Sequence, residues 1–296
     1  MPRRPSPLPA PLVVGPFTVE QARALDVTRQ RLRARDLRTP TRGLRTPLPS
    51  PTTVTGRARE VAAGLSGDFA FSHTTAARLH GLPTPARWTP DEPLDVMRAT
   101  GTALVTRRGV RSHGGLERRG VVTAHDLPVT DPLDTWVDLA GTWSVGDLVA
   151  LGDALLNAPV AARPKDLERL TDAPTRGVRR LREAVALVRP GAASAWESRA
   201  RVAFVSWGVP EPELNVDVHA DDGRWLARPD FVWRARRVVG EYDGDQHRTE
   251  RRVWQYERER RARLEDDGWT YVELTSLSLA PPHSTALRLR LTRLLC

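Results

Sequence analysis

Three acidic residues in the last third of the chain have the types and spacing expected of a metal site. Asp230 lies on one expected strand, and Glu241 and Asp243 lie on the next. If residues 234–237, three of which are arginines, form the turn of a hairpin, Asp230 and Glu241 face each other directly across the two strands. Asp243 is two residues beyond Glu241 and therefore points to the same face of the sheet.

A sheet face with opposed carboxylates requires a neutralising cation, because like charges at this separation destabilise paired strands. Mg²⁺ is typically held by one or two carboxylates together with water and substrate phosphate, and a bound metal lowers the pKa of its water. The pattern therefore predicts that Asp230, Glu241 and Asp243 bind Mg²⁺ (or Mn²⁺) and support hydrolysis of a phosphodiester bond.

The elements that must position these residues can be read from the same segment. Ser194 as N-cap and Glu197 three residues later form a capping box, which starts a helix that ends at Gly208. Asp222-Gly223 is a strong hairpin signal. The expected order is this helix, three antiparallel strands (213–220, 225–233 and 237–244), a long charged helix from 249 to Gly268 and a last strand (269–275).

This arrangement resembles the catalytic core of the PD-(D/E)xK nuclease superfamily. Pro229-Asp230 matches the PD half of the motif, and Glu241-Tyr242-Asp243 matches the E-x-K half, with Asp243 where the motif has lysine. The string VVGEYDGDQH looks like a bacterial branch related to very-short-patch mismatch repair endonucleases, in which an acidic residue at this position is usual. The resemblance implies a restriction-endonuclease-like fold that cleaves DNA with a divalent metal.

The resemblance also implies roles for residues beyond the metal ligands. Gln246 and His247 follow the motif, and His247 would serve as a general acid/base or as a phosphate contact. Glu273 stands where the branch has an arginine, so one expected phosphate contact is missing. The implied catalytic set is Glu197 from the first helix, Asp230 and Glu241 as metal ligands, Asp243 as a ligand or water-positioning group, Gln246 and His247.

Residues 17–56 have the outline of a winged helix-turn-helix. Thr18 is expected to cap a first helix and Thr28 a second, arginine-rich helix over residues 28–37, after which Gly43 permits a tight turn between two extended pieces. The second helix would lie in the major groove of DNA. The alternative is two short amphipathic helices joined by a tight turn. The DNA contacts expected here are Thr28, Arg29, Arg31, Arg33, Arg35 and Arg42.

Residues 57–190 mix helices and short strands and have no catalytic spacing. His73 and His113 are isolated and are expected to be structural or exposed, while Asp134 and Asp138 fit the solvated face of a helix. Together with the N-terminal helix-turn-helix, SHTTAARLHGL and DPLDTWVDLA resemble the antitoxin-type module of abortive-infection type IV toxin–antitoxin systems. A toxin as partner is implied by that resemblance alone.

The charge of the chain favours an anionic partner. It has 45 lysines and arginines against 36 acidic residues, a net charge of +9, and Lys165 is its only lysine. Arginine's planar fork of donors suits phosphate, so nucleic acid is the first candidate, although a GC-rich genome also encodes arginine in place of lysine. Cys296 is the single cysteine, and no apolar run of about 18 residues is present to span a membrane, so a cytoplasmic protein is expected.

These observations predict an α+β protein in four segments. Residues 1–16 are proline-rich and expected to be disordered, 17–56 form the winged helix-turn-helix and a linker, 57–190 an antitoxin-like α/β module, and 191–296 an endonuclease-like α/β/α core with a mixed sheet. The expected function is that of a DNA-binding, metal-dependent endonuclease; the alternative is a DNA-binding regulator or type IV antitoxin-like protein with an inactive nuclease fold. Converging carboxylates would favour the enzyme, and carboxylates bonded to arginines the regulator. RNA as the substrate and the oligomeric state are left open by the sequence.

Overall fold

The structure, a computed structural model, describes residues 5–157, 159–243 and 251–296, and only the backbone of residues 251–257. It is α+β with mixed sheets, as expected from the sequence. The chain divides into two compact units, Met1–Leu139 and Ala140–Cys296, called here the N-terminal and C-terminal units. The division falls at Leu139 and not at residue 190, because α5 (Val145–Leu156) packs against α8 (Ala195–Ser206) within one unit.

A two-stranded sheet and a capped helix begin the N-terminal unit. β1 (Phe17–Thr18) pairs antiparallel with β2 (Leu44–Arg45), and α1 (Val19–Ala24) follows β1 directly. Thr18 caps α1 as predicted: its Oγ1 accepts the N–H of Gln21 at 3.0 Å, and the Gln21 side chain accepts the N–H of Thr18 at 2.7 Å.

The proline-rich start of the chain is packed where the structure describes it. Leu12, in η1 (Ala10–Leu12), is buried in one hydrophobic cluster with Phe17 and Ala22. The expectation of disorder over residues 1–16 is therefore wrong for residues 5–16, because burying Leu12 offsets the entropy lost when this segment is ordered. Residues 1–4 lie outside the described residues.

The expected arginine-rich helix over residues 28–37 is not an α-helix. This stretch is described throughout, and it contains only η2 (Arg31–Arg33), one turn of 3-10 helix, after which the chain is extended at Ala34 (φ −65°, ψ 147°). The turn stops because Arg31 points inward, where it is buried and bonded to the Asp36 carboxylate at 2.7 and 2.9 Å and to the Ser6 carbonyl oxygen. A recognition helix of the expected length therefore does not form.

The rest of the N-terminal unit is a five-stranded mixed sheet on which two helices pack. The strand order is β5-β4-β3-β7-β6, with β3 parallel to β7 and β4 parallel to β5. Val61 and Leu79 of the helices are buried against Phe71, Val96 and Val129 of the sheet. The elements are α2 (Val54–Ala62), β3 (Ala70–Phe71), α3 (His73–Leu79), β4 (Leu94–Arg98), β5 (Val110–Gly114), η3 (Leu116–Arg118), β6 (Val121–Ala124), β7 (Leu127–Thr130) and α4 (Pro132–Leu139).

Two histidines that were expected to be isolated meet beside this sheet. The rings of His73 and His113 stack with their centroids 3.7 Å apart, and Nε2 of His113 lies 2.9 Å from Oδ1 of the buried Asp95. Burial, and then the charge of His113, lower the pKa of His73 to about 4. Asp138 is also not on a solvated face: its side chain is buried and accepts a hydrogen bond from Arg119 at 2.8 Å, and burial raises its pKa.

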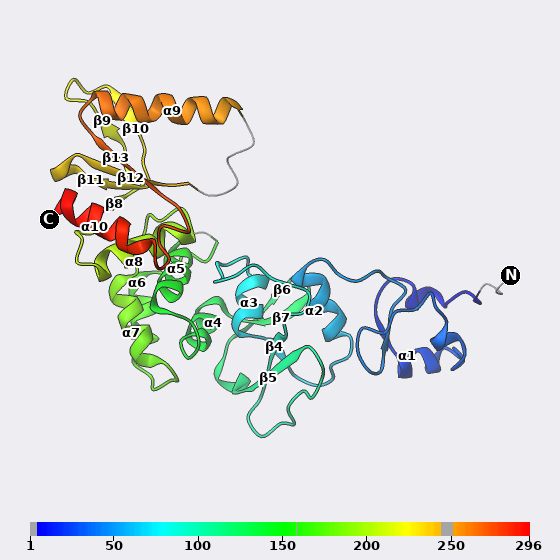
Figure 1. The fold of residues 1–296 in the computed structure, drawn as a ribbon. Helices are drawn as coiled ribbons and strands as arrows, with labels where there is room; N and C mark the ends of the chain where they lie inside the picture. The colour runs from blue at the N-terminus through cyan, green and yellow to red at the C-terminus, as the bar shows by residue number, and fades with distance from the viewer. Residues whose placement is uncertain (1–4, 158, 244–250) are drawn as a thin grey trace. The chain divides into compact units, whose positions relative to one another are not determined.

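The C-terminal unit has a four-stranded mixed sheet between two layers of helix (Figure 1). The strand order is β13-β12-β11-β8, in which only β12 and β13 are parallel. α8 and α10 cover one face, and α9 with the β9–β10 hairpin covers the other. The further elements are α6 (Pro164–Arg169), α7 (Val178–Leu187), β8 (Glu213–Leu214), β9 (Val218–His219), β10 (Trp225–Ala227), β11 (Phe231–Trp233), η4 (Arg234–Arg236), β12 (Val238–Tyr242), α9 (Arg251–Asp266), β13 (Thr270–Leu274) and α10 (Ser284–Leu295).

The hairpin that carries the acidic residues has the predicted register. Phe231 pairs with Gly240, and Trp233 pairs with Val238, so the same register places Asp230 opposite Glu241. The turn is formed by η4 and by Arg237 in the left-handed conformation (φ 49°), as the arginine segment predicted. Two of the expected strands are each divided into two shorter ones: 213–220 contains β8 and β9, and 225–233 contains β10 and β11. The outer strands β8 and β11 pair with each other in the four-stranded sheet, whereas β9 and β10 pair with each other in a separate hairpin.

No helix among the described residues is both long and apolar enough to cross a membrane. Even α9, with 16 residues, is dominated by charged side chains.

Candidate functional site

The helix α8 presents Glu197 at its N-terminal end. Ser194 caps α8 by accepting the N–H of Glu197 at 3.2 Å, as predicted. The reciprocal half of the expected capping box is displaced by one residue, because the Glu197 carboxylate accepts the N–H of Ala193 at 2.8 Å and not that of Ser194. Glu197 is 5% exposed, so its charge lies at a largely water-excluded position.

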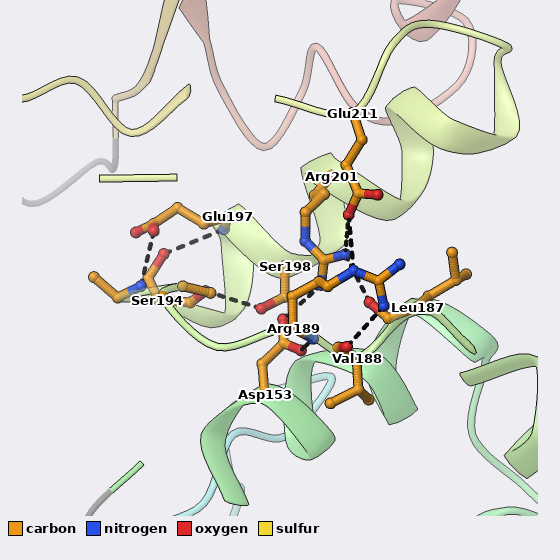
Figure 2. Close-up of polar contacts among 12 residues, drawn as sticks. Asp153, Leu187, Val188, Arg189, Ser194, Glu197, Ser198, Arg201 and Glu211 are labelled. Carbon is orange, nitrogen blue, oxygen red and sulfur yellow. Dashed lines mark hydrogen bonds and ion pairs between the residues drawn. The ribbon is translucent and has the colours of Figure 1, made fainter. Parts of the chain in front are cut away.

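A buried ion pair fixes α8 one turn beyond Glu197 (Figure 2). The Arg201 guanidinium donates to Asp153 of α5 at 2.8 Å, to the Leu187 carbonyl oxygen at 2.6 Å and to Glu211 at 2.9 Å. Asp153 also accepts the N–H of Arg189 at 2.7 Å. These bonds join α5, α8 and the segment after α7, and they hold the start of α8 in place.

Asp230 lies directly before β11 and is tied to both neighbouring strands. Its Oδ2 accepts the N–H of Tyr242 at 2.8 Å, and its carbonyl oxygen accepts the N–H of Asn215 at 3.1 Å. The Asn215 amide also donates to the Glu197 carboxylate at 2.6 Å. Asn215 holds a left-handed backbone (φ 51°), which asparagine tolerates better than most residues. This residue therefore connects the Glu197 carboxylate to the backbone of Asp230.

The Asp230 carboxylate is affected by the charge of Glu197. The pKa of Asp230 is raised above its ordinary value, first by burial and then by the negative charge of Glu197. The N–H of Tyr242 and the charge of Arg260 oppose this shift. Two carboxylates thus share a partly buried space in which a cation would be favourable.

Glu241 is held by a cation of the protein itself. Its side chain is 9% exposed, and its Oε2 accepts hydrogen bonds from the Arg260 guanidinium of α9 and from the Tyr271 hydroxyl of β13, the latter at 3.1 Å. Burial and the neighbouring Glu241 charge raise the pKa of Tyr271, so the hydroxyl stays protonated and donates. A carboxylate bonded to an arginine is the arrangement that the sequence analysis associated with a DNA-binding regulator and not with an enzyme.

The other predicted site residues are placed less informatively. Asp243 is half-buried, and its N–H donates to the Leu274 carbonyl oxygen at 2.8 Å. Glu273 is exposed and pairs in register with Glu241. Gln246 and His247 lie outside the described residues.

The described residues do not form a three-carboxylate metal cage. Among them, no group of three or more histidine, cysteine, aspartate or glutamate side chains has metal-binding geometry. Oε1 of Glu197 and Oδ1 of Asp230 have no hydrogen-bond partner among the described residues, so each keeps a hard oxygen donor. That set fits Mg²⁺ or Mn²⁺ held by two carboxylates with water completing the shell.

The charged side chain of Asp230 is expected to destabilise the fold relative to asparagine at the same position. Replacing it by asparagine keeps an acceptor for the N–H of Tyr242 but removes the buried charge that Glu197 repels. Because the folded pKa is raised, stability falls as the pH rises through the window between the unfolded and the folded pKa. We expect Asp230→Asn to raise the free energy of unfolding at pH 7 by about 0.5–2 kcal/mol, measured by urea denaturation without divalent metal. At pH 3, where both forms are uncharged, the gain should vanish.

Several residues at this site were not found from the sequence. Asn215 and Arg260 come from outside the motif, and Tyr271 lies on β13, which α9 separates from the strand of Glu241 along the chain. Trp196, 37% exposed, stacks on Tyr242 with ring centroids 5.3 Å apart. No local signal marked Asn215, because it occupies a polar position in the regular polar–apolar alternation of residues 213–220.

The residues expected to contact DNA are only partly available for it. Arg29, Arg33, Arg35 and Arg42 are exposed, while Arg31 is buried in its pair with Asp36. Thr28 is exposed, and its Oγ1 accepts the N–H of Arg31 at 3.2 Å, as expected of a cap. Arg31 therefore stabilises this segment and is unsuited to a DNA contact.

Comparison with known proteins gives two relatives. No family model matches the chain, and no solved structure matches it significantly. Two proteins from two strains of Mycobacterium tuberculosis, each described as an uncharacterized protein, are 32% identical to it over 99 residues. The match covers 33% of this chain and 36% of the length of each relative.

Proposed function

We propose that the C-terminal unit is a divalent-metal-dependent endonuclease that hydrolyses phosphodiester bonds in DNA. The observation that carries the proposal is the approach of Glu197 to Asp230, where each carboxylate keeps one oxygen without a partner among the described residues and Asp230 has a raised pKa. A carboxylate with a raised pKa beside a second carboxylate is found at many functional sites. We propose the cytoplasm as the place of the reaction.

The residues have separate tasks in this proposal. Asp230 and Glu197 would hold Mg²⁺ or Mn²⁺, which when bound would supply Lewis-acid stabilisation of the reacting phosphate. Asn215 ties the Glu197 carboxylate to the backbone of Asp230, and the exposed arginines of residues 29–42 would bind the DNA backbone. Asp243, Gln246 and His247 stay proposed members of the site by resemblance.

A second candidate rests on a specific contact. Glu241, one of the expected metal ligands, already has its charge neutralised by Arg260. A DNA-binding regulator or type IV antitoxin-like protein that keeps a nuclease fold without catalysis would have such a pair. In that case the arginine surplus serves binding alone, with a toxin as a partner proposed from the resemblance.

Cleavage of supercoiled plasmid by the full-length protein distinguishes the two candidates. We expect nicking with Mg²⁺ or Mn²⁺ and none with EDTA, and a loss of at least about 100-fold in Asp230→Asn and Glu241→Ala. Asp222→Asn, on the exposed β9–β10 turn, is the matched control and should cleave as the wild type does.

DNA binding measured on the same proteins completes the test. Salt-sensitive binding that is equal in all variants, with no nicking by any of them, would establish the regulator and reject the enzyme. Nicking that persists in Asp230→Asn would place the chemistry elsewhere.

A further inference from the structure

The strand β6 is an open edge of the five-stranded sheet in the N-terminal unit. Among the described residues it pairs with β7 alone, and it stands last in the strand order. Val121 is 48% exposed, and Val122, which points to the opposite face of the sheet, is 37% exposed. Both sides of this edge are therefore open to solvent.

The turn between β6 and β7 fixes which backbone groups point outward. His125 and Asp126 both have a left-handed backbone (φ 54° and 62°), as in the two-residue turn of a tight hairpin. Ala124 and Leu127 flank this turn and pair with each other, so they exchange both of their backbone hydrogen bonds.

Hydrogen-bonded and non-hydrogen-bonded pairs alternate from that point along the hairpin. The backbone N–H and carbonyl groups of Val121 and Thr123 consequently point away from β7. Gly120 follows the same alternation, because its carbonyl oxygen accepts the N–H of Asp131 at 2.8 Å on the β7 side. Within the part of the chain that the structure describes, the outward groups of Val121 and Thr123 have no hydrogen-bond partner.

The strand lacks the features that usually prevent an edge from pairing. Natural edge strands are blocked by proline, by charged side chains or by a β-bulge. The sequence of Val121–Ala124 is VVTA, without proline or charge, and its register with β7 runs without a bulge. Three of its four residues are β-branched, a type that is enriched in strands. This edge is therefore suited to accept another strand.

The charges at the two ends of β6 fit a second copy of the same strand. Arg118 precedes β6 and Asp126 follows it, with side chains that are 72% and 96% exposed. Within the chain these side chains form only long ion pairs, at 3.8 and 3.6 Å, among the described residues. Antiparallel pairing of Val121 with Thr123 of a second copy brings Arg118 of each copy to the end where Asp126 of the other copy lies.

We propose that two copies of this chain associate through β6, antiparallel about a two-fold axis at Val122. Val121 and Thr123 exchange backbone hydrogen bonds with Thr123 and Val121 of the second copy, and the two five-stranded sheets continue as one. Val122 meets Val122 of the second copy on the face where Ala124 packs against the hydrophobic core. The association does not depend on the proposed nuclease function. Because β6 has only four residues, the interface is small, and we expect a dissociation constant on the order of 10–100 μM.

Sedimentation equilibrium of the full-length protein between about 1 and 300 μM tests the association. The wild type should change from monomer to dimer over this range. Thr123→Pro removes one outward N–H at a position where an edge strand tolerates proline, and it should weaken the dimer by at least about 10-fold. A Thr123→Pro variant that folds and dimerises as the wild type does overturns the proposal.

A charge reversal tests the pairing without touching the strand, and it stands even if Thr123→Pro does not fold. Arg118→Glu should weaken the dimer by about 10-fold, because it places two carboxylates together at each end of the interface. In the Asp126→Asn background the same change should cost at most about 2-fold, since the opposing charge is gone. Arg108→Glu is the matched control: it reverses an exposed arginine next to β5, at the opposite edge of the same sheet, and should dimerise as the wild type does. An equal effect of Arg118→Glu in both backgrounds overturns the antiparallel register.

Hydrogen exchange shows whether this strand is the one that pairs. The amides of Val121 and Thr123 should exchange more slowly as the concentration of the wild type rises, because only the dimer protects them. A dimer in which these two amides exchange at the monomer rate forms through another surface and overturns the proposal. A chain that stays monomeric at every concentration also overturns it, and leaves the edge to a strand from a different protein.

Discussion

Replacing Arg201 by methionine is expected to lower the free energy of unfolding of the C-terminal unit by about 3–5 kcal/mol. Arg201 is 1% exposed, and the change leaves the equally buried Asp153 carboxylate without its cation. The Leu187 carbonyl oxygen and Glu211 lose a donor at the same time. Methionine keeps much of the side-chain volume, so the loss reports the charge and the hydrogen bonds more than a cavity.

The measurement must resolve the C-terminal unit, because a chain of two units need not unfold in one step. Hydrogen exchange of the α5 and α8 amides in increasing urea provides that resolution. Arg224→Met, the same chemical change at an exposed pair, should cost less than about 0.5 kcal/mol. A similar loss of free energy of unfolding in both variants would mean that the buried Arg201–Asp153 pair stabilises the unit no more than an exposed pair does. A C-terminal unit that no longer folds in Arg201→Met would agree with the prediction.

Acidification is expected to destabilise the N-terminal unit through His73. Its pKa is lowered from 6.5 in the unfolded chain to about 4 in the fold, by burial first and by the charge of His113 second, with Asp95 opposing. The folded state therefore binds fewer protons than the unfolded state between these values. The contribution of His73 is complete above pH 6.5 and is lost as the pH falls toward 4, to a total of up to about 3 kcal/mol.

His73→Asn separates this effect from other titrations. Asparagine tolerates the left-handed backbone of this position (φ 50°) and carries no titrating group. Between pH 7 and pH 4, the free energy of unfolding of His73→Asn should fall less than that of the wild type, by up to about 3 kcal/mol. His125→Asn is the matched control, since His125 has a similar backbone (φ 54°) but is exposed. Wild-type steepness in His73→Asn, or a titration of the His73 ring near pH 6.5 by nuclear magnetic resonance, would contradict the prediction.

The sequence predicted the hairpin well because local rules determine it. The arginine turn and the alternation around Asp230 and Glu241 set the register, and each strand needs only its neighbour to satisfy them. The Ser194 and Thr18 caps were predicted for the same reason, since a cap depends on residues three positions apart.

Long-range contacts explain what the sequence did not predict. The expected helix over residues 28–37 is reduced to one turn because Arg31 bonds to Asp36 and to the carbonyl oxygen of Ser6. No local sequence pattern predicts these bonds. His73 and His113 meet because α3 packs on the sheet to which β5 belongs. Likewise, the partner of Glu241 comes from α9, so the state of the site depended on tertiary structure.

The division of the chain after Leu139 determines which fragment of the candidate nuclease can fold on its own. A fragment that begins at residue 191 would retain Arg201 and Glu211 but lose Asp153 and Leu187, so Arg201 would lose its buried carboxylate partner and one of its two other acceptors. A fragment that begins at Ala140 takes the whole set of partners with it. A gene fusion that moves this unit to another protein should therefore carry the helices before α8 as well, and the portable module is larger than the motif-bearing segment.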